Sequence, residues 1–207
     1  MAGDRAARLI YVLGDQLDLE AAPIRELDPK RDVVLMAEVN DESRRIPSHI
    51  QRTVLFFSAM RHFAGELRAR GIEVRYVTIR DQSNTHTLAG ELRRACAAID
   101  PDRIILTEPG DQTVLASLQA EADALGIECA VLTDRHFLTS CDEFADWAKG
   151  KKQLVMEFFY RWQRRRLGIL MEGDQPVGGA WNFDKQNRLP FGKEGPIPRP
   201  PRPRRFA

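Results

Sequence analysis

Acidic residues, a glutamine and a glycine follow two short apolar runs, at positions where they could bind a ligand. They come after the runs at 9–13 and 33–37 and are Gly14, Asp15, Gln16, Glu38 and Glu42. A carboxylate accepts hydrogen bonds from a ring N–H or a hydroxyl group, and a glycine lets a ligand approach the backbone closely. This set therefore predicts a site for a neutral ligand rich in hydrogen-bond donors. In the alternative interpretation, Asp15 only caps the next element and the other acids form a solvated loop.

A second set of residues could contact an anion. Residues 149–207 hold 14 Lys/Arg and 5 Asp/Glu, whereas residues 1–148 hold 17 basic and 25 acidic residues. The basic part contains four arginines close to aromatic residues: Arg161, Arg164, Arg165 and Arg166. Arginines can bind phosphates while nearby aromatic rings stack on bases, which suggests nucleic-acid contact. For Phe158 and Trp181 we favour a place in a domain interface. In the alternative interpretation of the charge, the basic residues only solvate a helix and a linker.

No other chemistry is indicated. Cys96, Cys129 and Cys141 have no CxxC spacing, so they predict neither a zinc site nor an iron–sulfur site. HExxH, P-loop, GxGxxG and nucleophile-elbow motifs are absent from the sequence. We therefore predict no catalytic residue and no metal site. No apolar run approaches the roughly 20 residues that cross a bilayer, so we expect a cytoplasmic protein without a membrane partner.

The elements that position these residues follow from alternating apolar runs and helical patterns. Strands are expected near 9–13, 33–37, 73–78, 103–107 and 128–132, where the runs are nearly continuous and rich in β-branched residues. Helical faces are expected between them, one of them formed by Phe56, Met60, Phe63 and Leu67. Strand–helix alternation predicts a Rossmann-like, doubly wound α/β domain with a five-stranded parallel sheet over residues 1–140.

Residues 141–207 have a different pattern. A short helix is expected at 144–147 and a longer one at 153–170, with a buried face formed by Leu154, Phe158, Trp162 and Ile169. Mostly loop is expected from Met171 onward, and the end is rich in Pro and Arg, as linkers are. We therefore expect interdomain helices and a linker here, in the front part of a larger protein.

Six groups of residues occur in order along the chain. They are Leu13–Leu17, Ala37–Val39, Phe57–Ala64, Thr107–Gly110, Met156–Arg161, and Pro176–Gly179 with Trp181–Asp184 and Asn187–Arg188. With these motifs the chain resembles the deoxyribodipyrimidine photolyase-related proteins, which are iron–sulfur bacterial cryptochromes and prokaryotic (6-4) photolyases. The resemblance runs from Leu9 to about Pro200, which is nearly the whole chain.

The resemblance implies a photolyase fold with two domains. In this family an N-terminal α/β domain binds the antenna chromophore 6,7-dimethyl-8-ribityllumazine, and a helical domain binds FAD, a 4Fe–4S cluster and the DNA lesion. By motif match, Asp15 and Glu42 fall where the family holds the lumazine ring and its ribityl chain. The chain departs from the family pattern at Arg45, Ser48, His49, Gln51–Arg52 and Asp111–Thr113.

The resemblance implies the antenna-chromophore-binding domain of a light-dependent DNA-repair flavoprotein. The family is a lyase family, but we expect no FAD, no 4Fe–4S cluster and no catalysis from this chain alone. A separately encoded flavin-binding helical domain would be its partner, and DNA would contact the basic C-terminal segment. The alternatives are a free-standing module that binds a small ligand or nucleic acid, and a truncated remnant.

Overall fold

The computed structural model describes residues 8–41, 47–184, 199 and 201–202. The chain divides into two compact units between Glu143 and Phe144. The first unit contains a sheet whose strands are β1 (Arg8–Tyr11), β2 (Val33–Ala37), β3 (Glu73–Val77), β4 (Arg103–Thr107) and β5 (Glu128–Leu132). Its main helices are α1 (Ala22–Arg25), α3 (Ile50–Ala69), α4 (Leu88–Ile99) and α5 (Gln112–Leu125).

The sheet is all-parallel, with the strand order β3-β2-β1-β4-β5. The central strand β1 pairs with β2 through Leu9 and Val33, and with β4 through Leu9 and Ile104. The predicted Rossmann-like α/β fold with five parallel strands is therefore confirmed. In this topology the strand order reverses at β1, which places a crevice at the carboxyl ends of the central strands.

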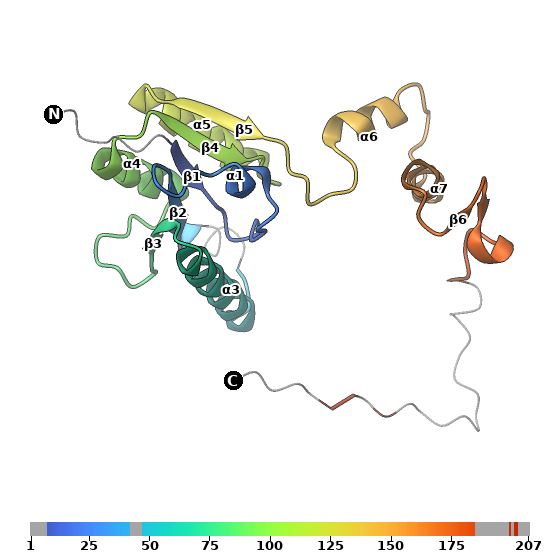
Figure 1. Cartoon of the computed structure of the whole chain (residues 1–207), viewed down its shortest axis with the longest axis horizontal. Helices are drawn as coiled ribbons and strands as arrows, with labels where there is room; N and C mark the ends of the chain where they lie inside the picture. The colour runs from blue at the N-terminus through green and yellow to red at the C-terminus, as the bar shows by residue number, and fades with distance from the viewer. Residues whose placement is uncertain (1–7, 42–46, 185–198, 200, 203–207) are drawn as a thin grey trace. The chain divides into compact units, whose positions relative to one another are not determined.

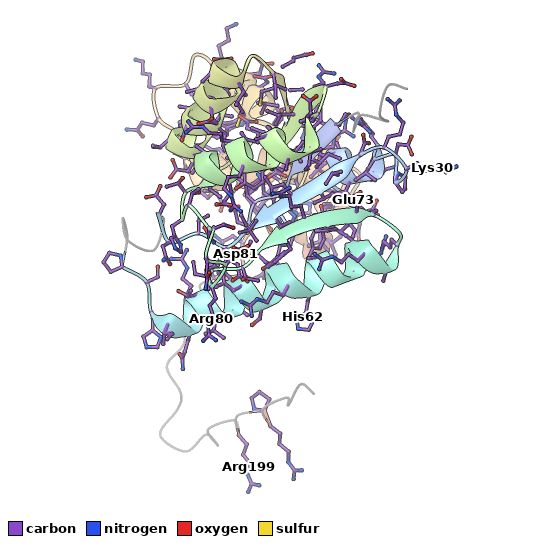
Figure 2. All side chains as sticks on the ribbon, turned by 90° about the vertical axis from the view of Figure 1, so that its left-hand side faces the viewer. Lys30, His62, Glu73, Arg80, Asp81 and Arg199 are labelled. Carbon is purple, nitrogen blue, oxygen red and sulfur yellow. The ribbon has the colours of Figure 1, made fainter. Side chains whose placement is uncertain are left out.

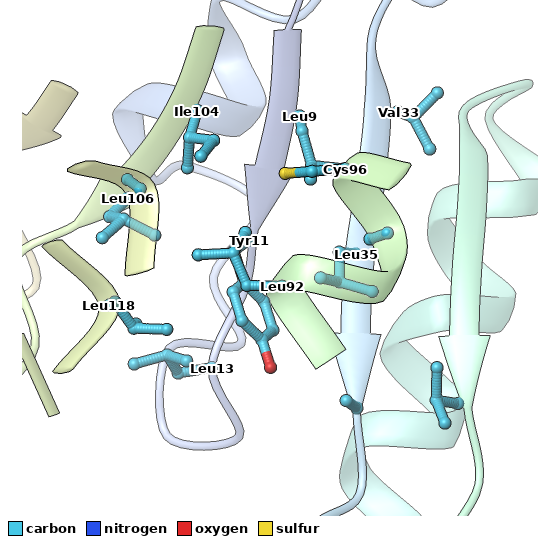
Figure 3. Packing of buried hydrophobic residues seen from close by; sticks show 14 of the residues in the cluster. Leu9, Tyr11, Leu13, Val33, Leu35, Leu92, Cys96, Ile104, Leu106 and Leu118 are labelled. Carbon is cyan, nitrogen blue, oxygen red and sulfur yellow. The ribbon is translucent and has the colours of Figure 1, made fainter. Parts of the chain in front are cut away.

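Helices cover both faces of the sheet (Figure 1), and each face has its own hydrophobic core. Successive strand residues point to opposite faces, so Leu9 and Tyr11 pack under α4 and α5, whereas Ile10 and Val12 pack under α1 and α3. Figure 3 shows the first of these cores, where Tyr11 lies beside Leu92 of α4. The near-continuous apolar runs in the sequence reflect burial on both faces.

Local signals fix both ends of α5, which begins at the carboxyl edge of the sheet. The side chain of Asp111 accepts a hydrogen bond from Thr113 N and caps the start of α5. Gly126 ends that helix with a φ of 69°, a left-handed conformation that glycine adopts without strain. The start of α5 is therefore held in place where it borders the crevice.

Charged side chains flank the edge strand β3 (Figure 2). Glu73 is exposed at its first position, and Arg80 and Asp81 are exposed shortly after its end. Charges beside an unpaired strand edge oppose its pairing with another chain. The same view labels His62, which lies on the exposed side of α3.

The second unit contains most of α6 (Cys141–Ala148), and α7 (Met156–Leu167). A short antiparallel hairpin follows, formed by β6 (Met171–Glu172) and β7 (Gln175–Pro176), and then a 3₁₀ turn at Val177–Gly179. The sequence predicted mostly loop from Met171 onward, so the hairpin was missed. It is only two residues long on each side, too short to produce a periodic pattern in the sequence.

For the helix predicted at 153–170, which corresponds to α7, three of the four residues predicted to be buried are not buried. Leu154, Phe158 and Ile169 are 57%, 60% and 45% exposed, respectively. The helix begins at Met156 rather than 153, and the ring of Phe159 packs 4.9 Å from that of Trp147 in α6. Trp162, the fourth predicted residue, does join this aromatic cluster, 5.6 Å from Phe159. The partner helix α6 therefore selects a different face of α7 from the one expected.

Candidate functional site

Two cavities open at the carboxyl edge of the sheet in the first unit. The first cavity has a volume of about 220 Å³ and is lined by residues that include Leu13, Ala37, Arg52, Met60 and Val114. The second cavity has a volume of about 330 Å³ and is lined by residues that include Gln16, Asp18, Leu55, Asp134 and His136. Gly14, Asp15 and Phe56 line both, so the two cavities adjoin along the loop after β1.

Gly14 allows this loop to lie close against α3. A Cβ atom at this position would lie 3.0 Å from the sulfur atom of Met60, which is closer than ordinary van der Waals contact. A larger residue would require the Met60 side chain, which lines the first cavity, to shift by a few tenths of an ångström. The glycine predicted as a ligand-site residue therefore also leaves room for the Met60 side chain.

Phe56 forms an aromatic wall between the two cavities. The guanidinium group of Arg52 lies 5.4 Å from its ring centroid and donates a hydrogen bond to the hydroxyl oxygen of Ser48 at 3.3 Å. Sequence reasoning assigned Phe56 to the core-facing side of α3 and missed its place in the cavities. Phe56 is half-buried near the start of α3 and lines both cavities, and it belongs to neither hydrophobic core of the described residues.

Asp15 and Gln16 supply hydrogen-bond acceptors to the cavities. The Asp15 side chain is exposed, and among the described residues its carboxylate has no hydrogen-bond partner. Gln16 Nε2 donates to the carbonyl oxygens of Thr107 and Glu108 at 3.3 and 3.1 Å, which fixes the orientation of its amide. Its Oε1 atom is buried and has no partner in the described part of the chain. An unpaired buried acceptor costs about 1–3 kcal/mol, so a donor on a ligand would fit this position.

Glu38 lines neither cavity. Its side chain is fully buried and accepts hydrogen bonds from Arg61 at 2.6 and 2.9 Å, from the Tyr76 hydroxyl at 2.7 Å and from Ile79 N at 2.8 Å. Its neighbours Ala37 and Val39 line the first cavity, and side chains in an extended segment alternate between opposite faces. The structure therefore places Glu38 in a brace between β2, α3 and β3, away from its predicted position at the ligand.

Hydrogen bonding controls the ionisation of this brace. Burial raises the pKa of Glu38, but hydrogen bonds from Arg61, Ile79 N–H and Tyr76 outweigh burial and lower the pKa overall. Burial and the Glu38 hydrogen bond raise the pKa of Tyr76. Glu38 is therefore a carboxylate, and Tyr76 a neutral hydroxyl, at neutral pH.

Glu42, the remaining predicted ligand residue, lies outside the described residues.

Besides Asp15, the second cavity is lined by two acids and a histidine that were not predicted as site residues. Asp18 lies in the loop after β1, and Asp134 and His136 follow β5. One oxygen of Asp18 accepts a hydrogen bond from Glu20 N, and one oxygen of Asp134 accepts from His136 N, at 2.9 and 2.8 Å. The rule that ligands bind beyond the carboxyl ends of parallel strands would have identified Asp134.

In the second unit, three of the four predicted arginines surround one ring. The guanidinium groups of Arg161, Arg164 and Arg165 lie 5.5, 5.3 and 4.6 Å from the centroid of Trp181. The fourth, Arg166, lies 5.0 Å from the Trp162 ring. Cation–π contacts of this kind orient the guanidinium groups.

The four arginines differ in their exposure and in their partners. Arg161 pairs with Glu157 at 2.9 Å, and the side chain of Arg164 is buried and donates to the carbonyl oxygens of Ile169 and Leu170. Arg165 and Arg166 are exposed, and Arg166 also donates hydrogen bonds to Gln163 Oε1 at 3.2 and 3.0 Å. These two are the most accessible of the four arginines predicted to contact nucleic acid.

Among the described residues, no three His, Cys, Asp or Glu side chains are grouped so that they could hold a metal ion. No described helix combines the length and apolar character that a membrane span requires.

Comparison with known proteins identifies relatives of this chain. A family model described as deoxyribodipyrimidine photo-lyase-related protein matches residues 10–207. A (6-4) photolyase of Agrobacterium fabrum is 45% identical over 184 residues, which are 89% of this chain and 36% of that protein. An uncharacterized protein of Acanthamoeba polyphaga mimivirus is 22% identical over 165 residues, which are 76% of this chain and 82% of that protein. The chain thus spans about a third of the length of the photolyase.

Proposed function

Since the chain belongs to the deoxyribodipyrimidine photolyase-related family, as its motifs predicted, we propose that its first unit binds the antenna chromophore of a light-dependent DNA-repair flavoprotein. The observation that carries the proposal is the pair of adjoining cavities, where an aromatic wall, an exposed carboxylate and a buried unpaired acceptor meet. Together the cavities reach the size range of small-molecule sites, which is about 300–1,000 Å³.

The residues of the cavities suit 6,7-dimethyl-8-ribityllumazine. The chromophore would supply the absorption of light. The Phe56 ring would pack against a planar heterocycle, and the Asp15 carboxylate would accept a hydrogen bond from a ring N–H or a ribityl hydroxyl. Gln16 Oε1 would accept a second hydrogen bond, which removes the cost of leaving it buried and unpaired.

We place the flavin, the iron–sulfur cluster and the repair step outside these 207 residues. The support is that the chain spans 36% of the related photolyase. In addition, Cys96 is buried, Cys129 is half-buried and Cys141 is exposed, and the three lie on different elements. The proposed partner is a flavin-binding helical domain, and repair requires both parts.

DNA contact is the second part of the proposal. Arg165 and Arg166 are exposed on α7, and residues 149–207 carry 14 basic and 5 acidic residues. A surface of this sign attracts the phosphate backbone without reading sequence. The contact would be non-specific, and salt would weaken it.

A fluorescence titration of the purified protein with the lumazine tests the chromophore site. Asp15→Ala should weaken binding about 10- to 100-fold, because a ligand donor then loses its acceptor at a cost of about 1–3 kcal/mol. Asp123→Ala is the matched control, since Asp123 is exposed on α5 and lines neither cavity. Equal affinity in the wild type and the Asp15 variant would move the site elsewhere. No binding to the wild type would favour a remnant or a nucleic-acid-binding module.

A further inference from the structure

We propose that the two cavities form one bipartite site, in which the second cavity selects a neutral, hydroxyl-bearing chain and rejects a phosphorylated one. The inference rests on the proposed function and extends it, because it assigns the discrimination to Asp18 and Asp134. The geometry points to a single site because Gly14, Asp15 and Phe56 border both cavities, so one ligand can occupy the two cavities together.

The second cavity is acidic. Asp15, Asp18 and Asp134 line it, and no Lys or Arg is among the described residues that do. A phosphate ester carries a charge of about −1.5 to −2 at neutral pH. Placed here, it would meet three carboxylates, and His136 is the only side chain among the described lining residues that can carry a positive charge. Since the carboxylates come from the β1 loop and from the segment after β5, the negative potential surrounds the cavity from two sides.

The same groups are suited to hydroxyl donors. Asp18 and Asp134 each accept one backbone N–H, and a carboxylate has about four lone-pair sites, so both retain capacity for further donors. The buried Oε1 of Gln16 adds an acceptor that has no partner among the described residues. A polyol chain offers several O–H donors in a row, which this set of acceptors can receive. Leu55 and Ala59 of α3 provide an apolar wall for its carbon atoms.

The first cavity differs in its charge. Arg52 lines it, and its guanidinium group lies over the Phe56 ring that separates the cavities. Phe57 and Met60 provide further flat or pliable apolar surface. A planar ring with carbonyl oxygens suits this environment, since Arg52 can donate to them. The ring therefore belongs in the first cavity and its chain in the second.

The test compares two ligands that differ in one group. They are 6,7-dimethyl-8-ribityllumazine and its 5′-phosphate ester, titrated at pH 8 with the full chain while lumazine fluorescence is followed. The wild type should bind the neutral compound at least about tenfold more tightly, because like charges a few ångströms apart repel strongly near a protein surface. The double variant Asp18→Asn, Asp134→Asn should reduce this preference to less than about threefold. Most of the change should come from tighter binding of the ester.

Glu20→Gln is the control variant, because Glu20 is an exposed acid two residues from Asp18 that lines neither cavity. It should keep the wild-type preference. Circular dichroism of each variant should match that of the wild type. Equal binding of both compounds to the wild type, or an unchanged preference in the double variant, would overturn the inference and leave the proposed function standing. Failure of the wild type to bind either compound would overturn both.

Discussion

Replacing Arg61 by alanine should strongly destabilise the first unit, although Arg61 lies on the surface side of α3. The carboxylate of Glu38 is fully buried, while 54% of the Arg61 side chain is exposed. Removing Arg61 would leave a buried negative charge with only the Tyr76 hydroxyl and Ile79 N–H as partners. Loss of one partner of a buried pair costs about 3–5 kcal/mol. Because Arg61 is half-exposed, we expect the lower end, about 3 kcal/mol.

Arg70→Ala provides a closely matched control. Arg70 follows the last residue of α3, is also 54% exposed and forms an ion pair with Glu66 at 2.9 Å. Glu66, however, is itself 50% exposed, so water screens the pair and its loss should cost about 0–1 kcal/mol. The two variants remove the same side chain at the same exposure and differ mainly in the burial of the acid.

Urea unfolding followed by far-UV circular dichroism would measure the two costs. Arg61→Ala should lower the unfolding midpoint clearly without a large change in the slope m, and Arg70→Ala should leave it nearly unchanged. The unfolding midpoint of Arg61→Lys should lie between those of the two alanine variants, since an ammonium group keeps the charge but cannot form the bidentate contact with the Glu38 carboxylate. Equal effects of the two alanine variants would refute the assignment of Glu38 to a structural brace.

Three further outcomes are expected. The pKa of Glu38 is lowered in the folded protein. Its contribution to stability is therefore present above about pH 4.3 and is lost as pH falls through the folded pKa. The free energy of unfolding should consequently fall less steeply with decreasing pH in Glu38→Gln than in the wild type. Burial raises the pKa of Cys96 to about 11. At pH 8 a thiol reagent should therefore modify the exposed Cys141 first and Cys96 only after unfolding. Rapid labelling of Cys96 in the folded protein would contradict its burial. Arg164→Leu should speed amide exchange over 169–176 about 10- to 100-fold, because a charged donor to two carbonyl oxygens is lost; unchanged exchange would show that the hairpin does not depend on it.

The strands and their parallel arrangement could be predicted because each strand is a nearly continuous apolar run between turn residues. Val33–Ala37, for example, is buried at every position, and burial on both faces is typical of parallel sheets. The same pattern did not show that Glu38, one residue later, would turn away from the ligand crevice. Its partners Arg61 and Tyr76 lie on other elements, so their contact depends on how the elements pack.

The candidate site was only partly predictable for a similar reason. Asp15 follows a strand directly, so its place at the sheet edge follows from topology. Asp18 and Asp134 meet at one cavity only because β1 lies two strands from β5 in the folded sheet. On α7, the aromatic residues repeat so closely that several faces are apolar, and only the packing of Trp147 against Phe159 identifies the buried one.

The position of β1 in the sheet also has a consequence for how the chain folds. Its two neighbours are β2, which follows soon after it, and β4, whose residues 103–107 are synthesised much later. Until β4 emerges from the ribosome, one edge of the central strand has no partner. Pairings over such long separations make folding slow and expose apolar surface in the meantime. The nascent chain therefore carries an open, apolar strand edge, a target for chaperones, until Ile104 can pair with Leu9.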